Sequence, residues 1–296
     1  MQFHKRIYTT AAAALIFAAT IAAHATTPPK FDAIYVFGDS YNDVGNLYLA
    51  TGNTYPAAPY YQGRFSNGPL WVEHVAGSYG LPMTPSITGG TDFAFGGAEV
   101  LQPVPLGTGE IPSVPDQIEQ YLGLHGGKAD PNALYIIEGG GNDILDATGG
   151  SPTVLGNDIA NALLASIHLL EQSGARNLFV PRLFDVGHLH AANEEGIASF
   201  AATATAALNE GLDDGLLSVP EGTHLYRIDT YTLLNAIIAD GTHYGFHWLS
   251  TPCLDKSVSP PVVCGDITEH YFWDSVHPTT FGHAFFAVLA EQELNN

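Results

Sequence analysis

The chain has 296 residues and a formal net charge of −21, from 9 basic and 30 acidic side chains. This length is enough for one large α/β domain with a sizeable core. The excess of acid excludes a basic nucleic-acid-binding module and repels anionic lipid headgroups at long range. Such a surface is compatible with a cationic ligand and equally with simple solubility outside the cell.

The first 25 residues have the features of a secretory signal peptide. His4-Lys5-Arg6 precedes an alanine-rich apolar run from about Ala11 to Ala23, which ends in Ala23-His24-Ala25, an A-x-A cleavage motif. The run is short and weakly apolar for a membrane anchor, and no second run is long enough to span a bilayer. We therefore expect cleavage after Ala25, export to the periplasm or the medium, and no transmembrane anchor in the mature protein.

A short apolar run, residues 33–37, leads directly into Gly38-Asp39-Ser40. The run is long enough for a buried parallel strand, and ligands of open α/β sheets bind at the carboxyl ends of strands. On this pattern alone, Ser40 is equally compatible with a helix cap and with a nucleophile. Near the other end of the chain, Asp274 and His277 supply a carboxylate and an imidazole, which favours the nucleophile.

The rest of the chain alternates strands with helices. Four further segments have the pattern of strands: Thr91 to Phe95, Leu134 to Glu138, Asn177 to Pro181 and Thr223 to Ile228. Helices are predicted over Leu70 to Tyr79, Val114 to Leu122, Val154 to Gln172, Ile197 to Leu217 and Thr279 to Gln292. This alternation, without repeat or linker, predicts one domain over residues 26–296, an α/β/α sandwich around a mainly parallel five-stranded sheet.

Two predicted strands end in glycines. Gly96-Gly97 follows the second strand, and Gly139-Gly140-Gly141 leads to Asn142 after the third. Glycine lets a backbone N–H approach a ligand closely, although a tight turn explains the same residues. The second run lacks the lysine and the G-x-G-x-x-G spacing of phosphate loops. Asn142 suits an uncharged amide donor or an Asx turn.

Four blocks, in one order, resemble the GDSL, or SGNH, family of serine esterases and lipases. They are Phe37 to Asn46, Phe93 to Ala98, Gly140 to Asp143 and Asp274 to Pro278, which together span nearly the whole mature chain. The resemblance implies an SGNH-hydrolase (flavodoxin-like) fold and ester hydrolysis through an acyl-enzyme, without cofactor or metal. It implies Ser40, Asp274 and His277 as catalytic residues.

The same resemblance implies an oxyanion hole made by the backbone N–H groups of Ser40 and Gly97 and the amide of Asn142. The family usually has asparagine where this chain has Asp92. The pattern is most similar to the bacterial secreted lysophospholipase and esterase branch. We expect a monomer that acts on a small-molecule ester or a lysophospholipid, without a nucleic-acid partner. Choline-ester hydrolysis, acyl transfer, sugar deacetylation, metal-dependent hydrolysis and a non-catalytic exported binding protein remain alternatives.

Two cysteines and two aromatic segments complete the predictions. In an exported chain, Cys253 and Cys264 are expected to form a disulfide, which would pin the loop before Asp274. Tyr55 to Tyr61 and Tyr271 to Trp273 are predicted to border the site, where they would bind a quaternary ammonium or form core and acyl-chain wall. Four histidines are expected to be ordinary surface residues rather than metal ligands: His188, His190, His243 and His247.

Overall fold

The computed structural model describes residues 31–296, so the predicted signal peptide lies outside the described residues. At the centre of the described residues lies a parallel sheet in which each strand is hydrogen-bonded to the next. Its strands, in spatial order, are β1 (Ile34–Phe37), β4 (Leu134–Ile137), β5 (Asn177–Phe179) and β6 (His224–Tyr226). Every residue of β4 is buried, as expected for a central parallel strand. The predicted α/β fold is confirmed.

The sheet has four strands, not the five that were predicted. Thr91–Phe95 lies parallel to the free edge of β1, but it pairs only through one bridge, between Val36 and Asp92, and a few backbone hydrogen bonds. The Gly38 N–H could continue this ladder, but it donates to Oε1 of Gln117 at 2.8 Å. With this segment counted, the spatial order is 2-1-3-4-5, the flavodoxin-like order in which ligands bind beside the first strand.

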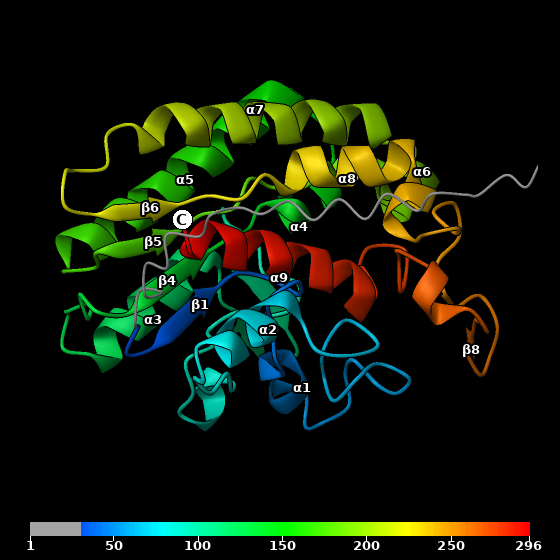
Figure 1. The fold of residues 1–296 in the computed structure, drawn as a ribbon, viewed down its shortest axis with the longest axis horizontal. Coiled ribbons are helices and arrows are strands. Elements are labelled where there is room, and N and C mark those ends of the chain that lie inside the picture. The colour runs from blue at the N-terminus through cyan, green and yellow to red at the C-terminus, as the bar shows by residue number, and fades with distance from the viewer. Residues whose placement is uncertain (1–30) are drawn as a thin grey trace, which may run out of the picture.

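Helices cover both faces of the sheet (Figure 1). On one face, α5 (Pro152–Gln172) packs along α7 (Ala198–Leu216), with α3 (Val114–Leu124) beside α5. On the other face, α2 (Trp71–Ser78) packs against α9 (Thr280–Leu294).

The side chains of the central strands confirm these layers. Tyr135 of β4 hydrogen-bonds to Tyr121 of α3, while Phe179 of β5 lies 5.8 Å from Trp71 of α2 between ring centroids. Phe179 pairs in register with Ile136, the neighbour of Tyr135, so the two aromatic contacts lie on opposite faces. The molecule is an α/β/α sandwich.

The five long helices agree with the predicted ranges to within two residues at each end. Ser113, Ser151 and Thr279 cap α3, α5 and α9, each side-chain oxygen accepting an N–H from the first turn. Four further helices were not predicted: α1 (Asn46–Ala50), α4 (Gly141–Leu145), α6 (His190–Glu194) and α8 (Thr230–Ala239). Single 3-10 turns span Ser86–Thr88, Val186–His188, Gly241–Tyr244 and Ile267–Glu269.

Helix α5 is the one helix of residues 31–296 that is long and apolar enough to cross a membrane. Four side chains along it are buried in the core: Ile159, Leu163, Ile167 and Leu170. Its approach to α7 is very close, because a Cβ on Gly156 would lie only 2.3 Å from the carbonyl oxygen of Ala204. It therefore packs as a core helix of the sandwich.

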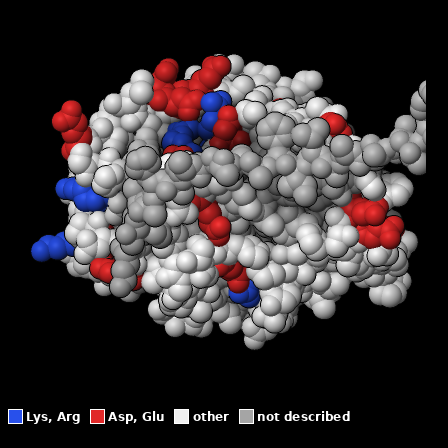
Figure 2. All heavy atoms as spheres, in the orientation of Figure 1, with Lys and Arg blue, Asp and Glu red and all other residues white. Residues whose placement is uncertain are grey.

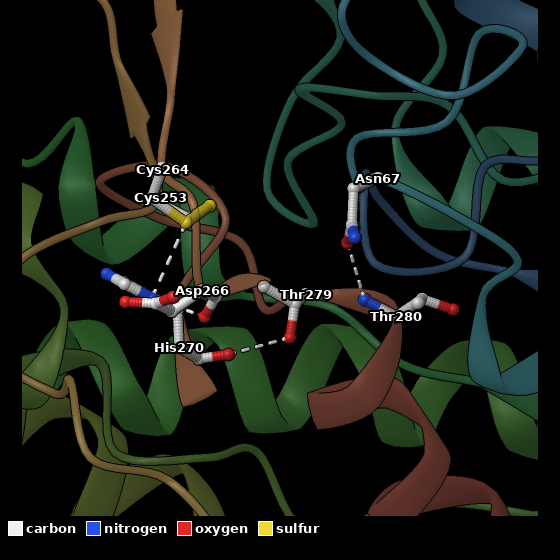
Figure 3. Close-up of a disulfide and its surroundings, with 7 residues drawn as sticks. All are labelled: Asn67, Cys253, Cys264, Asp266, His270, Thr279 and Thr280. Carbon is white, nitrogen blue, oxygen red and sulfur yellow. Dashed lines mark hydrogen bonds between the residues drawn. A yellow bond between two sulfur atoms is a disulfide. The ribbon is translucent and has the colours of Figure 1, made fainter. Parts of the chain in front are cut away.

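Two small hairpins lie outside the main sheet, β2 (Val104–Leu106) with β3 (Gly109–Ile111), and β7 (Leu254–Asp255) with β8 (Val262–Val263). The second lies in the segment where the sequence showed no regular pattern. The predicted disulfide, Cys253–Cys264, closes its base (Figure 3). The Leu254 N–H donates to the carbonyl oxygen of Trp273 at 2.7 Å. This bond attaches the hairpin to the residue before Asp274.

Candidate active site

Three residues from opposite ends of the chain meet beyond the carboxyl end of β1. Nε2 of His277 lies 2.7 Å from Oγ of Ser40, across 237 positions of sequence. Nδ1 of the same ring lies 2.9 and 3.0 Å from the two carboxylate oxygens of Asp274. All three side chains are buried. This continuous chain of hydrogen bonds can activate a serine hydroxyl.

The loop before α9 is built to present the imidazole. Oδ1 of Asp274 accepts the backbone N–H groups of Val276 and His277 at 2.9 and 2.7 Å, so the carboxylate folds its own loop. The Tyr41 hydroxyl, next to Ser40, donates to the carbonyl oxygen of Val276 at 2.7 Å. At the start of α9, the Thr280 N–H donates to Oδ1 of Asn67 at 2.8 Å (Figure 3).

The loop that carries Ser40, residues 38–43 (the serine loop), is also held by close packing and hydrogen bonds. A Cβ on Gly38 would lie 2.5 Å from the amide nitrogen of Asn42, so only glycine fits. Gln117 of α3 also accepts the Gly38 N–H and donates to its carbonyl oxygen. The Asp43 carboxylate accepts the Gly96 N–H at 2.8 Å, which joins the first family-like block to the second.

The predicted oxyanion donors come from the ends of three adjacent segments: β1, residues 91–95 and β4. Within residues 31–296, the N–H groups of Ser40 and Gly97 make no hydrogen bond and are available to a ligand. Gly97 has φ of +80°, a conformation that favours glycine. The Asn142 amide donates one hydrogen to Ala98 at 2.9 Å, which leaves its second hydrogen for a ligand.

Asp274 has two partners that the sequence did not predict. The Tyr60 hydroxyl donates to its Oδ2 at 2.5 Å, and Nζ of Lys256 lies 3.6 Å from the same oxygen. Burial by itself raises the pKa of Asp274, but His277 first, then Lys256 and Tyr60, outweigh it and hold that pKa well below its ordinary value. The carboxylate therefore stays ionised beside the imidazole. Tyr60 lies in a segment that was predicted to border the site. No sequence motif pointed to Lys256.

Two buried carboxyl groups lie in or next to the serine loop. Burial raises the pKa of Asp39 to about 6, although the Tyr41 N–H and His277 oppose the shift. Burial, reinforced by Asp39, raises the pKa of Glu138 well above its usual range. One Glu138 oxygen accepts the Asn42 amide at 2.7 Å, and the other has no partner among residues 31–296. The sequence analysis identified Asp39 only as part of the Gly38-Asp39-Ser40 motif.

The aromatic segments divide between the core and the site. Tyr271, Phe272 and Trp273 are fully buried, in agreement with the core alternative. The Phe65 ring lies 5.0 Å from the ring of His277, and the Tyr60 ring has the ammonium of Lys256 5.8 Å from its centroid.

The prediction that four histidines lie on the surface is only partly correct. His243 and His247 are exposed, and His247 lies 3.2 Å from a carboxylate oxygen of Glu269. His188 and His190 are partly buried instead, because His188 binds Asn235 and the His190 ring packs on Phe272. None of these four lies among the described residues that could jointly hold a metal, which are His270 and the two disulfide-bonded cysteines.

The sequence profile of the GDSL-like lipase/acylhydrolase family matches residues 34–289, a range that contains all four blocks and the whole site. The chain belongs to this family. Membership supports carboxylic ester hydrolysis as the chemistry of the site.

Two bacterial relatives align with most of the chain. The thermolabile hemolysin of Vibrio parahaemolyticus is 27% identical over 92% of this chain, which spans 66% of the length of the hemolysin. The phosphatidylcholine-sterol acyltransferase of Aeromonas hydrophila is 25% identical over 88% of this chain and 89% of its own length.

Similarity extends to plants. A GDSL esterase/lipase of Arabidopsis thaliana is 26% identical over 83% of this chain and 82% of its own. Among solved structures, the carbohydrate acetylesterase Est24 of Sinorhizobium meliloti is 13% identical over 70% of this chain and 98% of its own, with a TM-score of 0.41. At that score, the fold assignment rests on the topology of this chain.

Proposed function

We propose that this protein is an exported serine hydrolase that cleaves carboxylic esters through an acyl-enzyme on Ser40. One observation carries the proposal: the continuous hydrogen-bonded chain from Asp274 through His277 to Ser40. In these roles His277 is the general base and acid, and Asp274 orients its ring and stabilises the imidazolium.

The reaction has two steps with this arrangement. Ser40 Oγ forms a bond to the ester carbonyl carbon while its proton moves to Nε2 of His277. The developing oxyanion accepts N–H groups from Ser40, Gly97 and Asn142. The tetrahedral intermediate then expels the alkoxide, which takes the proton from His277 and leaves as an alcohol. A water molecule repeats the sequence on the acyl group, releasing the acid and restoring Ser40.

An apolar cluster beside the oxyanion donors suits the acyl chain. Its buried members are Leu47, Phe65, Phe95, Ala98 and Ile111. Cδ1 of Ile111 lies 3.3 Å from the position that a Gly97 Cβ would occupy. We infer that the substrate carries an apolar acyl group, as short esters and lysophospholipids do.

Acyl transfer is a second candidate function, favoured by the similarity to the Aeromonas acyltransferase over most of both chains. In that case an alcohol in place of water accepts the acyl group from Ser40, and the same residues act. Product analysis with and without added alcohols distinguishes the two outcomes.

Active-site labelling tests the proposal directly. A fluorophosphonate should add one adduct to the pure protein, and peptide mass spectrometry should place it on Ser40. Ser40→Ala should abolish the adduct, and His277→Ala should lower kcat by roughly 10³-fold or more. The control is Ser66→Ala, at a buried serine that hydrogen-bonds to Pro278, which should still be labelled. Labelling that persists in Ser40→Ala contradicts the proposal.

The substrate is tested with a panel of short esters, lysophospholipids, acylcholines and acetylated sugars. We expect hydrolysis of the apolar acyl esters and little of the acetylated sugars. Binding of the panel without turnover indicates a non-catalytic binding protein instead. Protein purified from the medium or periplasm should begin at Thr26, which tests export and cleavage after Ala25.

A further inference from the structure

Asp274 is held by a pair of side chains from two distant loops. The Tyr60 hydroxyl, from the segment before α2, donates to Oδ2 of Asp274 at 2.5 Å. Lys256, from the β7–β8 hairpin, places its ammonium 3.6 Å from the same oxygen and 3.2 Å from the Tyr60 hydroxyl oxygen. The three groups form a closed triangle around Oδ2 of Asp274, the oxygen that also lies 3.0 Å from Nδ1 of His277.

The environment makes this triangle important for the imidazole. The Asp274 side chain is only 3% exposed, so its charge is weakly screened by water. Its Oδ1 is already engaged by two backbone N–H groups of its own loop. Oδ2 is therefore where outside groups can change how strongly the carboxylate attracts a proton on His277.

We propose that Tyr60 and Lys256 are positioning residues that act on His277 through Asp274 and set the low-pH limit of catalysis. This inference rests on the proposed function, since it assigns a role in the same hydrolysis. The disulfide-closed hairpin supplies Lys256, so it takes part in the site without touching the reacting atoms.

Other ionisable groups also face the Asp274–His277 pair. They are Asp39 and Tyr41 from the serine loop, Tyr55 from the segment before α2, and His283 from α9. Burial lowers the pKa of His283 to about 3, so that ring is neutral, and burial raises the pKa of Tyr41 and Tyr55. Lys256 is the one permanent cation among these groups and Tyr60.

The direction of the effect follows from charge. Catalysis requires a neutral imidazole that can accept the Ser40 proton. The positive charge of Lys256 opposes the imidazolium, and the Tyr60 hydrogen bond withdraws negative charge from the carboxylate that stabilises it. Both therefore oppose the imidazolium, and loss of either should make the enzyme lose activity at a higher pH.

Two variants with matched controls test the proposal. Tyr60→Phe removes only the hydroxyl and keeps the ring contacts with Phe65 and Trp273, and Lys256→Met keeps an unbranched chain without charge. In each, the acidic midpoint of the kcat/KM profile should rise by about 0.5–1 pH unit. Tyr244→Phe, at the end of the 3-10 turn Gly241–Tyr244, and Lys128→Met should keep the wild-type profile.

Salt gives a separate test of Lys256, whose side chain is 50% exposed. Raising the ionic strength from about 0.05 to 0.5 M should move the wild-type midpoint toward that of Lys256→Met. The midpoint of Lys256→Met should move much less. Equal salt shifts in both proteins contradict an electrostatic role for Lys256.

A readout without turnover separates this inference from the proposed function. The proton between Nδ1 of His277 and Asp274 should give a far-downfield NMR resonance, which should move further downfield in Tyr60→Phe as the carboxylate gains charge. If both variants keep the wild-type resonance and the wild-type pH profile, the inference is overturned. A shifted resonance together with a Ser40 that no fluorophosphonate labels overturns the proposed function and the role in catalysis, although Tyr60 and Lys256 still act on the Asp274–His277 pair.

Discussion

Asp92 illustrates, at the scale of one residue, how burial decides protonation. Its two carboxyl oxygens accept the N–H groups of Val44 and Ala94 at 2.7 and 3.0 Å, and it is fully buried. Burial first, and then the charge of Asp43, raises its pKa well above the ordinary value. The hydroxyl oxygen of a protonated carboxyl can still accept an N–H, whereas the NH2 group of an amide only donates. An asparagine in this backbone arrangement would therefore leave one of the two N–H groups without its acceptor.

The stability of the protein should therefore fall as pH rises above about 5. The folded state holds protons on Asp92, and on Asp39 and Asp43 with pKa values of about 6, which the unfolded chain has already released. The stabilisation is complete below an unfolded pKa of about 4 and declines as pH rises through the folded values. Urea unfolding from pH 5 to 8 measures this slope.

Asp92→Asn should make that slope shallower because it removes one titrating group. It should also lower the stability at every pH, because the amide nitrogen cannot accept the backbone N–H that faces it. The control is Asp158→Asn, on the exposed side of α5, which should follow the wild-type slope. An unchanged slope in Asp92→Asn would show that the buried carboxyl is not protonated on folding.

The site also shows where prediction from sequence ends. Ser40, Asp274 and His277 were predicted because each lies within a local block that has a recognisable spacing. Tyr60 reaches Asp274 across 214 positions of sequence and Lys256 across 196. No local pattern encodes such contacts, because they arise only when separate loops pack together.

At the scale of elements, the long helices were predicted to within two residues because caps and apolar spacing are local signals. The prediction of a fifth strand was wrong because of a contact between distant parts of the chain. Gln117, from a helix, takes the Gly38 N–H that would have continued the ladder. The short helices α1 and α4 begin at glycines without a side-chain cap, so they lacked the usual start signal.

Two glycines inside helices have very different surroundings, so substituting each by alanine should have opposite effects on stability. Gly156→Ala places a methyl group 2.3 Å from the Ala204 carbonyl oxygen, and should destabilise the fold by about 1–3 kcal/mol. Gly77→Ala, in α2, has open space around it and should stabilise by up to about 1 kcal/mol. Thermal unfolding of both variants checks this, and a stabilised Gly156→Ala contradicts the close packing.

The disulfide hairpin should contribute to both stability and activity. Cys253 and Cys264 close a loop with a separation of 11 residues, and the hairpin bonds to Trp273 beside the site. In the chain-entropy description, a loop of this size contributes about 3 kcal/mol. Cys253→Ser with Cys264→Ser should lower the melting temperature and kcat/KM, and reduction of the wild type should do the same. Two free thiols in the native protein would contradict the bond.

For the whole molecule, the dominant electrostatic fact is the net charge of −21. Figure 2 shows acidic side chains scattered over one face of the described part, with a few basic groups among them. Such a field attracts cations and repels anions at low ionic strength. Lys256, beside the proposed catalytic carboxylate, is therefore unusual against its surroundings, and its effect on the imidazole is opposite in sign to that of the average field.

The separation of 237 positions between Ser40 and His277 also has a consequence for biosynthesis. At translation rates of roughly 5–20 residues per second, Asp274 and His277 leave the ribosome roughly 10–50 s after Ser40. Until α9 has emerged and docked on α2, a nascent chain holds Ser40 without the imidazole that contacts it in the folded protein. If the proposed triad is correct, a nascent chain is therefore inactive until almost all of it has been made.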